Sequence, residues 1–574
     1  MAAFGNNKEM KGGASLQIIS DVGIVGLRIL MALFAIFILF ECFASLRRQK
    51  RVEKPLVVLR DERTGENIPV LCWENSIGRS RSCDIVLQDP TVSRNHCVLL
   101  RREGGWYVTD SGSKSGTMVN DEMAGTRTKV CIDDQIKVGS SLFTLCRGEE
   151  FEGEIKHSWF FSRASKRPFV SAPLLLILVN LFHTFMCIEL CVSFEMWRPE
   201  AFMILGATIL FSWVVYAFSR GVFSRRNFEL ETIAVLLTGT GAMLLVNQDI
   251  KDAWVQIIAA MAGAVLYMGI LMFIKNPDRI VKWRLAVMIG SVAFLAINLA
   301  FGTVEFGAAN RIYIAGVSIQ PSELVKVAYI FVGASALDHL QTKRNFLEFI
   351  IFSAVCVGAL AVMGDFGTAL IFFLTFIVIS ITRSGDYKTV ILALVGAALA
   401  VVLILSFKPY IAERFATWGH ALEDPYDKGY QQAGVLTYIA SGGFFGVGVG
   451  NGFLRYYGAS ETDLVFGIIT EEMGFVIALT IAVTICALVL SSRSMVSRSR
   501  STFYSISAVC AASMMLIQAS LNIFGCTDLL PLTGVTLPFV SAGGSSMLSC
   551  WGLLAFIKAA DERTYSKTKP EDRL

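Results

Sequence analysis

A chain of 574 residues in which 54% are hydrophobic and only 17% are charged, with a mean hydropathy of +0.57, is suited to a membrane rather than to water. Its formal net charge of +4 is too small for this length to indicate nucleic-acid binding, and its 13 cysteines show neither CxxC spacing nor histidine-rich neighbours. These features argue against a nucleic-acid partner, a disulfide framework and a cysteine metal site, and they predict a multi-pass membrane protein.

The first apolar run, Ile18–Leu46, is long enough to cross a bilayer as a helix. The basic cluster RRQKR follows it at Arg47–Arg51, and such clusters stay in the cytoplasm, which predicts an external N-terminus. No small-residue cleavage site follows, so residues 1–54 are expected to form a permanent anchor. Asp21 and Arg28 lie in the outer half of the run, where long side chains reach the interface, and we favour that interpretation over a functional role.

Residues 55–150 form a segment of much lower hydropathy. Short alternating stretches such as PLVVLR, DIVLQD, HCVLLRR and GWYVTD are separated by Gly, Asp, Asn and Ser, a pattern typical of a small all-β sandwich. A second basic cluster, from Lys156 to Arg167, opens the next segment, 151–229, and precedes two apolar runs. This cluster predicts that the sandwich stays in the cytoplasm.

The rest of the chain is a succession of apolar runs of bilayer length. They are expected to begin near Ser171, Ala201, Glu231, Ala253, Arg284, Ser322, Phe346, Phe366, Thr389, Leu464, Thr502 and Pro538. Basic clusters between them fall on one predicted side, which places the tail at 561–574 in the cytoplasm. The predicted fold class is a polytopic α-helical membrane protein of about 13 spans with an inserted all-β sandwich. Two outer segments, 302–321 and 408–463, are longer than a connection requires, and we expect chemistry there.

An ordered set of short motifs lies within the predicted sandwich: GR at 78–79, SRNH at 93–96 and SGT at 115–117. In this order and spacing they resemble the forkhead-associated (FHA) domain, a module that binds phosphothreonine. The resemblance implies phosphopeptide contacts from Arg79, Ser93, Arg94, Ser115 and Thr117, and structural roles for Gly78 and His96. Arginine suits this ligand because a guanidinium group binds phosphate through two donors.

One position departs from the FHA pattern. The family commonly has Asn-Gly-Thr where this chain has Ser115-Gly116-Thr117, and serine lacks the amide that can donate and accept at once. Affinity or peptide choice is therefore expected to differ. A sandwich kept as a spacer or as a protein-docking surface is the alternative, but the presence of Arg79 and Ser93 favours binding of a phosphothreonine-containing protein.

Four stretches of the second half carry another resemblance. They are Gly307–Lys326, Gly364–Leu370, Gly429–Phe475 and Leu530–Ser546. In order and spacing they resemble the SEDS family (FtsW, RodA and SpoVE) of peptidoglycan glycosyltransferases. The resemblance covers residues 230–560 and implies a core of about ten spans. The anchor at 1–54 and the two spans within 151–229 are then additions to that core.

Three charged residues are candidate substrate-binding residues. Glu323 and Lys326 stand three apart in a helix expected to begin at Pro321, so they share a face and can pair where either alone would be unfavourable in a membrane. Arg311 precedes them in the outer segment and offers a cation to a phosphate-bearing ligand. A purely structural ion pair is the alternative role for Glu323 and Lys326.

Asp463 is the candidate catalytic residue. It ends the long outer segment, and a carboxyl beside an apolar wall has its pKa raised toward that of a usable base. The SEDS resemblance implies an essential aspartate at this place, although the usual His-Thr-Asp-Phe is Glu-Thr-Asp-Leu at 461–464 here. The added charge of Glu461 would raise that pKa further or bind a divalent cation, Mg or Mn. A helix N-cap is the alternative role for Asp463.

The remaining motif residues are expected to be mainly structural. Asp365 in GDFGT is expected to form a tight turn between spans, and SAGGSS at 541–546 is expected to allow close packing. Glu471 and Glu472 lie about two turns into a span, where a polar helix contact and a ligand contact are equally suited to them.

The SEDS resemblance also implies a substrate and a partner. The substrate is lipid II, a disaccharide-pentapeptide on an undecaprenyl pyrophosphate carrier in the membrane. Asp463 would deprotonate the 4-hydroxyl of the acceptor GlcNAc, which attacks C1 of the donor MurNAc with inversion. The implied partner is a class B penicillin-binding protein, because no Ser-x-x-Lys nucleophile stands in an outer domain. A lipid II flippase and an inactive scaffold that recruits phosphoproteins remain open alternatives.

Overall fold

The computed structural model describes most of the chain. The described residues are 6–47, 55–148 except 81–82, 103–104 and 126, 171–193, 198–223, 228–336 except 306–307 and 315–316, 343–384, short pieces between 391 and 398, 418–496 except 428, and 501–561. The basic cluster from Lys156 to Arg167, most of the span expected from Thr389, and the tail after Asp561 lie outside them.

The all-β sandwich predicted for the low-hydropathy segment is confirmed. One sheet has the strand order β2-β1-β11-β10-β7-β8 and the other has the order β4-β3-β5-β6-β9. The strands of the first sheet are β1 (Val57–Asp61), β2 (Asn67–Val70), β7 (Thr117–Val119), β8 (Glu122–Met123), β10 (Gln135–Val138) and β11 (Ser141–Arg147). Those of the second are β3 (Glu74–Gly78), β4 (Ile85–Val86), β5 (Cys97–Arg102), β6 (Gly105–Asp110) and β9 (Thr128–Val130). Alternate residues such as Val108, Ile136 and Leu145 fill the core between the sheets.

The described helices follow the expected apolar runs, except α12 (Tyr430–Gly442), which lies within the outer segment expected at 408–463. They are α1 (Asn6–Arg47), α2 (Ala172–Ser193), α3 (Pro199–Phe223), α4 (Glu229–Leu245), α5 (Ile250–Ile274), α6 (Pro277–Phe301), α7 (Pro321–Ala336), α8 (Lys343–Met363), α9 (Phe366–Ser384), α12 (Tyr430–Gly442), α13 (Val465–Val496), α14 (Thr502–Cys526) and α15 (Gly544–Ala560). Eight helices among the described residues are long and apolar enough to cross a membrane. Together with the shorter apolar helices they form a multi-pass membrane bundle.

Helix ends are set by local sequence. Asp249 caps α5 by accepting a hydrogen bond from the backbone of Lys251, and Asn276 caps α6 just before Pro277. The last expected span was placed too early, because the backbone from Pro538 to Gly543 is not helical and α15 begins only at Gly544. The positive φ of Phe539 (64°) and of Gly543 (148°) explains why the helix cannot start sooner.

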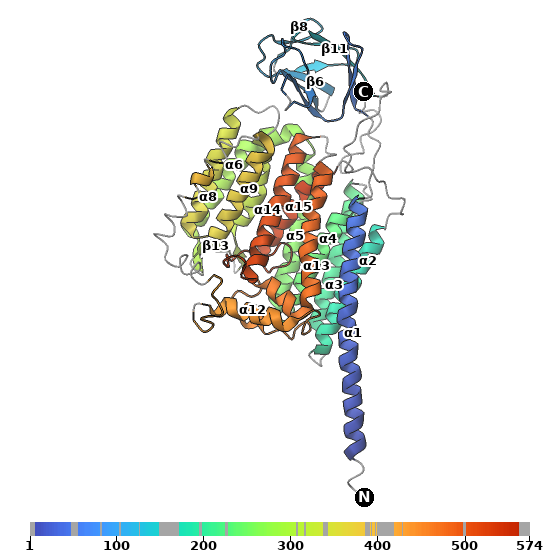
Figure 1. Cartoon of the computed structure of the whole chain (residues 1–574), viewed down its shortest axis with the longest axis vertical. Coiled ribbons are helices and arrows are strands. Elements are labelled where there is room, and N and C mark those ends of the chain that lie inside the picture. The colour runs from blue at the N-terminus through green and yellow to red at the C-terminus, as the bar shows by residue number, and fades with distance from the viewer. Residues whose placement is uncertain are drawn as a thin grey trace.

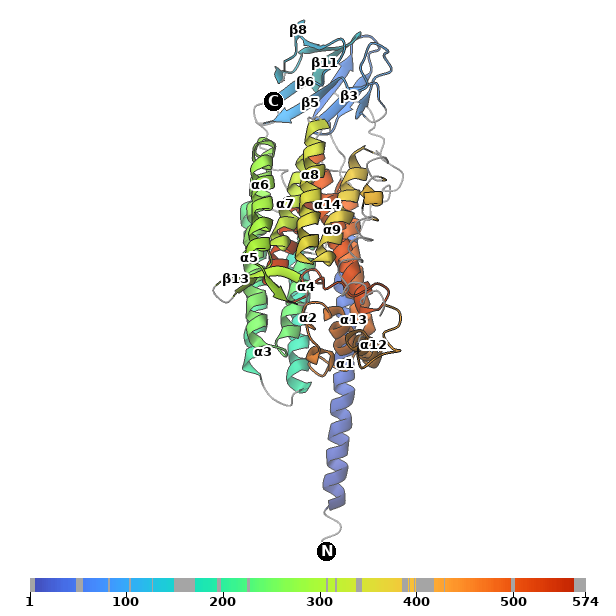
Figure 2. The same ribbon diagram turned by 90° about the vertical axis from the view of Figure 1, so that its left-hand side faces the viewer.

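Two groups of elements that connect helices lie on the side of the bundle away from the sandwich. A three-stranded sheet, β12 (Thr303–Glu305), β13 (Ala308–Ile314) and β14 (Val317–Ile319), lies between α6 and α7. The sandwich lies over one end of the bundle, β13 lies at the ends of α6 and α8 that face away from the sandwich, and α12 lies toward the other end of the bundle, beyond which α1 extends (Figures 1 and 2). We call these two ends the sandwich end and the far end.

Candidate functional site

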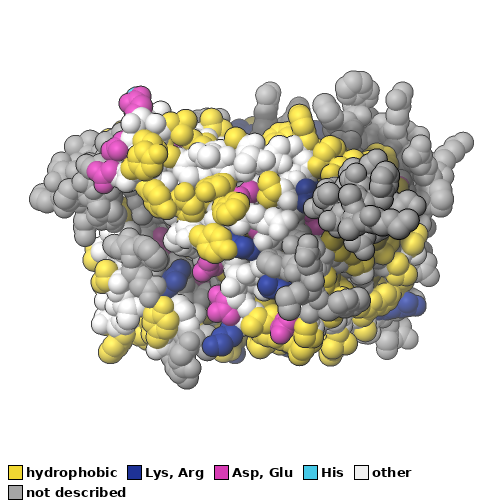
Figure 3. All heavy atoms as spheres, turned by 90° about the horizontal axis from the view of Figure 1, so that it is seen from below, with side chains coloured by type: hydrophobic (Ala, Val, Ile, Leu, Met, Phe, Trp, Pro, Cys, Tyr) yellow, Lys and Arg dark blue, Asp and Glu magenta, His cyan; other side chains and the backbone are white. Residues whose placement is uncertain are grey.

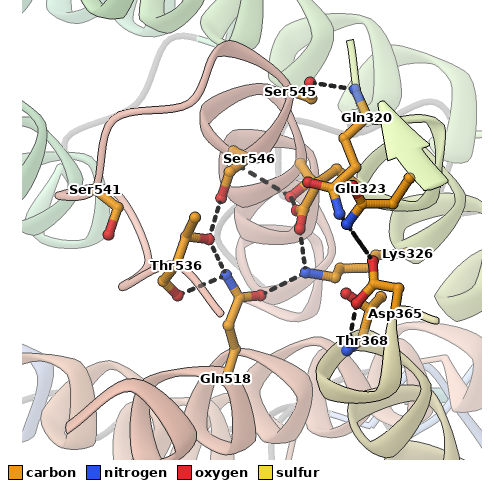
Figure 4. A network of polar contacts seen from close by, with 12 residues as sticks. Gln320, Glu323, Lys326, Asp365, Thr368, Gln518, Thr536, Ser541, Ser545 and Ser546 are labelled. Carbon is orange, nitrogen blue, oxygen red and sulfur yellow. Dashed lines mark hydrogen bonds and ion pairs between the residues drawn. The ribbon is translucent and has the colours of Figure 1, made fainter. Parts of the chain in front are cut away.

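A buried ion pair anchors a polar network inside the bundle (Figure 4). The Lys326 side chain on α7 is 0% exposed, and its Nζ lies 2.7 Å from Oε1 of Glu323, so the expected pairing is confirmed. Lys326 also donates to Oε1 of Gln518 at 2.9 Å, and Ser549 donates to the second oxygen of Glu323 at 2.8 Å. Each charge therefore has a neutral hydrogen-bond partner beyond the ion pair, as a buried pair requires.

The network continues into the segment before α15. Gln518 donates to the carbonyl oxygen of Thr536 at 3.0 Å and to its hydroxyl at 2.9 Å, and that hydroxyl lies 2.7 Å from the hydroxyl of Ser546. Ser545 accepts from the backbone N–H of Gln320 at 2.9 Å. The role expected for SAGGSS, small-residue packing alone, is therefore incomplete, because its serines hydrogen-bond to two other parts of the membrane core.

The residues around Asp463 are held through consecutive backbone carbonyls. Ala542 donates its N–H to the carbonyl oxygen of Glu461 at 2.9 Å, and Ser541 donates to that of Thr462 at 2.6 Å. The carbonyl oxygen of Asp463 accepts from Asn522 at 2.9 Å. Its carboxylate is half-buried and lies close to the backbone of Gly534, where an added Cβ would come within 3.3 Å of Oδ2. These bonds fix the backbone from which the carboxyl group of Asp463 projects.

One face of α14 links Asp463 to the ion pair. Gln518, which bonds Lys326, and Asn522, which bonds the carbonyl of Asp463, are four residues apart and so lie on the same side, separated by about 6 Å along the axis. Sequence reasoning missed both amides. The signal that could have found them is their spacing within an apolar helix, because polar residues inside the membrane usually have partners.

Asp365 joins three elements at the far end. Its Oδ1 accepts from the backbone of Thr368 at 3.1 Å and so caps α9, which accounts for the expected break between spans. Its Oδ2 accepts from Gln320 and from Asn310, each at 3.0 Å. The turn therefore also ties β13 and the start of α7 together.

Arg311 follows Asn310 on β13. Successive side chains of a strand point to opposite faces, so Arg311 points away from the side on which Asn310 meets Asp365. Its carbonyl oxygen accepts from Thr303 at 3.1 Å. The structure thus brings Glu323 and Lys326 together with Gln518, and it leaves Arg311 half-exposed on the small sheet.

The two glutamates of α13 organise a loop that leads to Asp463. Glu471 accepts from the backbone of Phe453 at 2.7 Å and of Leu454 at 3.0 Å, and Glu472 accepts from Gly450 at 2.9 Å. Both are buried, so a polar structural contact describes them better than a ligand contact. The helix breaks just after them, at Gly474, whose φ is 87°.

The interpretation of Arg28 as a side chain that merely reaches the interface is wrong. Its Nε lies 2.7 Å from Glu189 on α2, and its two terminal nitrogens donate to the carbonyl oxygens of Gly446 and Val447 at 2.8 Å each. The anchor helix therefore holds the same loop that Glu471 and Glu472 hold from the core.

The far end offers a mixed surface to ligands. Seen from that end, charged side chains of both signs lie among hydrophobic ones (Figure 3). Exposed aromatic residues of the segment before α13 are Trp418, Tyr426, Tyr430, Phe444, Phe445, Phe453 and Tyr456. No group of three His, Cys, Asp or Glu side chains that could hold a metal occurs in the part of the chain that the structure describes. Glu461 and Asp463 would have to hold a cation with groups from the ligand.

The FHA-like motifs meet at one end of the sandwich. Arg79 donates its backbone N–H to the carbonyl of Ser93 at 3.0 Å, which joins two of the loops. His96 is 0% exposed; its Nδ1 accepts from the backbone of Ser93 at 3.1 Å, so Nε2 carries the proton and donates to the carbonyl of Gly116 at 3.0 Å. A Cβ at position 78 would collide with the carbonyl oxygen of Arg94. Both predicted structural residues thus shape these loops.

The predicted phosphopeptide contacts differ in exposure. Arg79, Arg94 and Ser115 are exposed and Ser93 is half-exposed, so their side chains are accessible to a ligand. Thr117 is 1% exposed, and its hydroxyl donates to Asp110 at 2.7 Å, so it supports the loop instead of offering that hydroxyl outward.

An aspartate stabilises the loop before SRNH. Asp89 accepts hydrogen bonds from Ser140 at 2.5 Å and from the hydroxyl of Thr91 at 2.6 Å, and these bonds hold the pKa of its carboxyl well below the usual range.

Comparison with known families agrees with this geometry. A family model described as a cell cycle protein, FtsW/RodA/SpoVE, matches residues 227–566, more than half of the chain. The chain belongs to this family. A second family model, the FHA domain, matches residues 75–139.

Three relatives place the chain within the FtsW/RodA/SpoVE family. A protein named probable peptidoglycan glycosyltransferase FtsW of Bacillus subtilis (strain 168) is 29% identical over 60% of this chain and 93% of its own length. Stage V sporulation protein E of the same organism is 30% identical over 55% of this chain and 90% of its own length. The peptidoglycan glycosyltransferase RodA of Mycobacterium tuberculosis (strain ATCC 25618 / H37Rv) is 25% identical over 59% of this chain and 79% of its own length.

A solved structure shares the fold of the membrane core. It belongs to a peptidoglycan synthase complex and aligns with a TM-score of 0.50 at 22% identity, over 59% of this chain and 99% of that one.

Proposed function

We propose that this protein is a peptidoglycan glycosyltransferase that polymerises lipid II at the outer face of a bacterial membrane. One observation carries the proposal: the backbone around Asp463 is fixed to the same face of α14 that holds the buried Glu323–Lys326 pair. The proposal is supported by the names of the FtsW and RodA relatives. In this arrangement the far end is outside, and the FHA domain and the C-terminus are cytoplasmic.

Asp463 is the proposed general base. It takes the proton of the 4-hydroxyl of the acceptor GlcNAc as that oxygen attacks C1 of the donor MurNAc, and the bond from C1 to the pyrophosphate oxygen breaks with inversion. Arg311, half-exposed on β13, is the proposed cation for the departing pyrophosphate. Lys326 is neutralised by Glu323, so this pair acts mainly by positioning α7 against α14.

The proposed domains keep the boundaries expected from the sequence. Residues 1–54 form the anchor, 55–150 the FHA domain, 151–229 the linker with two added spans, 230–560 the catalytic core and 561–574 the tail. We propose that Arg79, Ser93, Arg94 and Ser115 bind a phosphothreonine-containing protein, which regulates or localises the enzyme. A class B penicillin-binding protein is the proposed partner that crosslinks the strands.

The deciding experiment is polymerisation of labelled lipid II by the full chain, alone and with a co-expressed class B penicillin-binding protein. Asp463→Asn keeps the shape but removes the base, and we expect roughly a 10²–10⁴-fold loss of glycan strands. Asp427→Asn, at an exposed carboxylate of the same outer segment, is the matched control and should polymerise as the wild type does.

Other outcomes would select the alternatives. Equal polymerisation by wild type and Asp463→Asn would remove Asp463 from the reaction. A folded wild-type protein that makes no strands with its partner would contradict the proposal: transport of lipid II between leaflets would then identify a flippase, and phosphopeptide binding alone a scaffold.

A further inference from the structure

The sandwich is in direct contact with the bundle through four of its side chains, Trp73, Glu74, Arg102 and Arg127. Trp73 packs edge-on against Tyr504 on α14, with ring centroids 5.9 Å apart. Glu74, at the start of β3, accepts from the backbone N–H of Thr502 at 3.1 Å. Arg102, at the end of β5, pairs with Glu74 at 2.8 Å. The contact is therefore made by polar groups with defined partners as well as by rings.

Glu74 acts as a cap for α14 from a distant part of the chain. The helix begins at Thr502, and the N-cap residue Ser501 has extended dihedral angles but makes no side-chain capping hydrogen bond. The first N–H groups of a helix need acceptors, and a carboxylate is especially favourable there because the helix dipole is positive at that end. Glu74 is only 2% exposed and is held in place by Arg102. The cap is thus both charged and fixed.

Arg102 and a further sandwich residue, Arg127, reach a second helix, α6. Asp278, in the first turn of α6, lies 3.8 Å from Nε of Arg102 and 3.5 Å from Arg127 on the sandwich. Tyr504 in turn donates to the carbonyl oxygen of Ile274, the last residue of α5, at 2.7 Å. The starts of α6 and α14 are thereby tied to one rigid β structure.

The two tied helices carry the candidate active site at their far ends. Gln518 and Asn522 lie about 24 Å and about 30 Å along α14 from Thr502, at a rise of about 1.5 Å per residue. α6 leads directly into the small sheet that bears Asn310 and Arg311. A shift of α14 along its axis would therefore move the partners of Lys326 and of the Asp463 backbone together.

The phosphate-binding loops are at the opposite end of the same strands. β3 runs from Glu74 to Gly78, about 13 Å, and Arg79 follows it. β5 begins directly after His96 and ends at Arg102. Because the contact with the bundle uses the other strand ends, the exposed side chains of Arg79 and Arg94 stay accessible while the sandwich is docked.

We infer that Glu74 is a positioning residue of the membrane enzyme: by capping α14 it fixes the axial position of that helix, and through Gln518 and Asn522 it sets the position of Lys326 and Asp463. This inference rests on the proposed function for its activity readout only. The FHA domain is then a structural part of the core and not only a tethered phosphopeptide receptor.

The test compares variants of the full chain in lipid nanodiscs. Glu74→Gln weakens the cap, and Glu74→Gln/Ser501→Asp supplies a new cap and the lost charge from the neighbouring residue. Glu66→Gln, an exposed glutamate on the turn of the sandwich, is the matched control. The readouts are the rate of lipid II polymerisation at low and saturating substrate, hydrogen exchange along α14, and binding of a phosphothreonine peptide.

We expect Glu74→Gln to lower kcat by roughly threefold to tenfold, the range that one helix cap supports, with KM little changed. Hydrogen exchange should rise at the start of α14 and also near Gln518 and Asn522. Ser501→Asp should restore both readouts, and peptide binding should stay at the wild-type level in all variants, which shows that the sandwich is folded.

Three results would overturn the inference. The first is that Glu74→Gln changes neither kcat nor hydrogen exchange. The second is that hydrogen exchange in Glu74→Gln rises only at the first turn of α14. The third is that Glu74→Gln/Ser501→Asp does not restore an activity lost in Glu74→Gln. If the wild type makes no glycan, the proposed function fails. The rise of hydrogen exchange near Gln518 in Glu74→Gln, and its reversal by Ser501→Asp, still test the positioning role.

Discussion

The proposed phosphate-binding loops of the sandwich, which contain residues 78–80, 93–96 and 115–117, and the polar network of the bundle use the same kinds of side chain in opposite ways. In the loops, backbone hydrogen bonds and the buried His96 hold the shape, while Arg79 and Arg94 remain exposed to solvent. In the bundle, Lys326 and Gln518 are buried, and each bonds other buried groups.

This difference predicts how the two regions respond to change. An exposed arginine is hydrated in the absence of ligand, so its removal alters binding and leaves the fold intact. A buried lysine holds a buried carboxylate, so its removal leaves an uncompensated charge and alters the fold first. A substitution in the sandwich loops should therefore change peptide binding without changing stability, whereas a substitution in the polar network of the bundle should change stability and activity together.

The largest expected effect is in the bundle. Lys326→Met leaves Glu323 without its cation, and we expect the full chain to lose about 3–5 kcal/mol of stability. Thermal unfolding in detergent, followed by fluorescence, measures the loss. Lys251→Met, at an exposed lysine on α5, should leave the unfolding temperature unchanged. If the double variant Glu323→Gln/Lys326→Met is no more stable than Lys326→Met, the uncompensated charge is not the cause.

The next effect is in the sandwich and concerns binding alone. Arg79→Ala should weaken the binding of a phosphothreonine peptide by about 1.5–3 kcal/mol, because a charge-assisted hydrogen bond to phosphate is lost. Titration calorimetry of the full chain measures it, with Arg63→Ala, an exposed arginine of the β1–β2 turn, as control. If Arg79→Ala lowered the unfolding temperature as much as Lys326→Met does, the claim that this arginine affects binding and not stability would be wrong.

The same contrast explains which parts of the site could be predicted from sequence. The sandwich motifs are short, so the structural roles of Gly78 and His96 could be predicted from the order of the motifs alone. Glu323 and Lys326 could be paired because a spacing of three places them on one helix face. Each of these inferences needs only neighbouring residues.

The rest of the network depends on contacts between distant segments. Gln518 meets Lys326 across 192 positions of sequence, and Ser541 meets Thr462 across 79. Arg28 reaches Gly446 across 418 positions, which is why it resembled an ordinary interfacial residue. Periodicity locates the helices but not their rotation or neighbours, so these partners emerge only from the packed bundle.

A smaller effect tests the departure of the loops from the usual FHA pattern. Ser115 is exposed and donates to the carbonyl oxygen of Thr91 at 3.3 Å. Ser115→Asn adds an amide that can both donate and accept, so we expect phosphothreonine-peptide affinity to rise by about 0.5–1.5 kcal/mol. The exposed Ser111→Asn is the control in the same titration. Weaker binding by Ser115→Asn would mean that the serine is matched to a different peptide geometry.

The smallest effect is a pH dependence of loop stability. Hydrogen bonds from Ser140 and Thr91 lower the pKa of Asp89, so its anion stabilises the folded sandwich above the ordinary aspartate pKa of about 3.9. That stabilisation is lost as the pH falls through the lower pKa of the folded state. Asp89→Asn should therefore increase hydrogen exchange at the β10–β11 turn at neutral pH, and the difference from wild type should shrink in acid.

The control for this comparison is Asp121→Asn, at an exposed aspartate with a left-handed backbone (φ 68°) that asparagine also adopts readily. Exchange rates are corrected for their intrinsic pH dependence before the variants are compared. A difference that grows on acidification would mean that the protonated form of Asp89, not its anion, is the form that the turn favours. The sign of this one difference thus tests whether hydrogen bonds to a charged oxygen hold the loop that precedes Ser93.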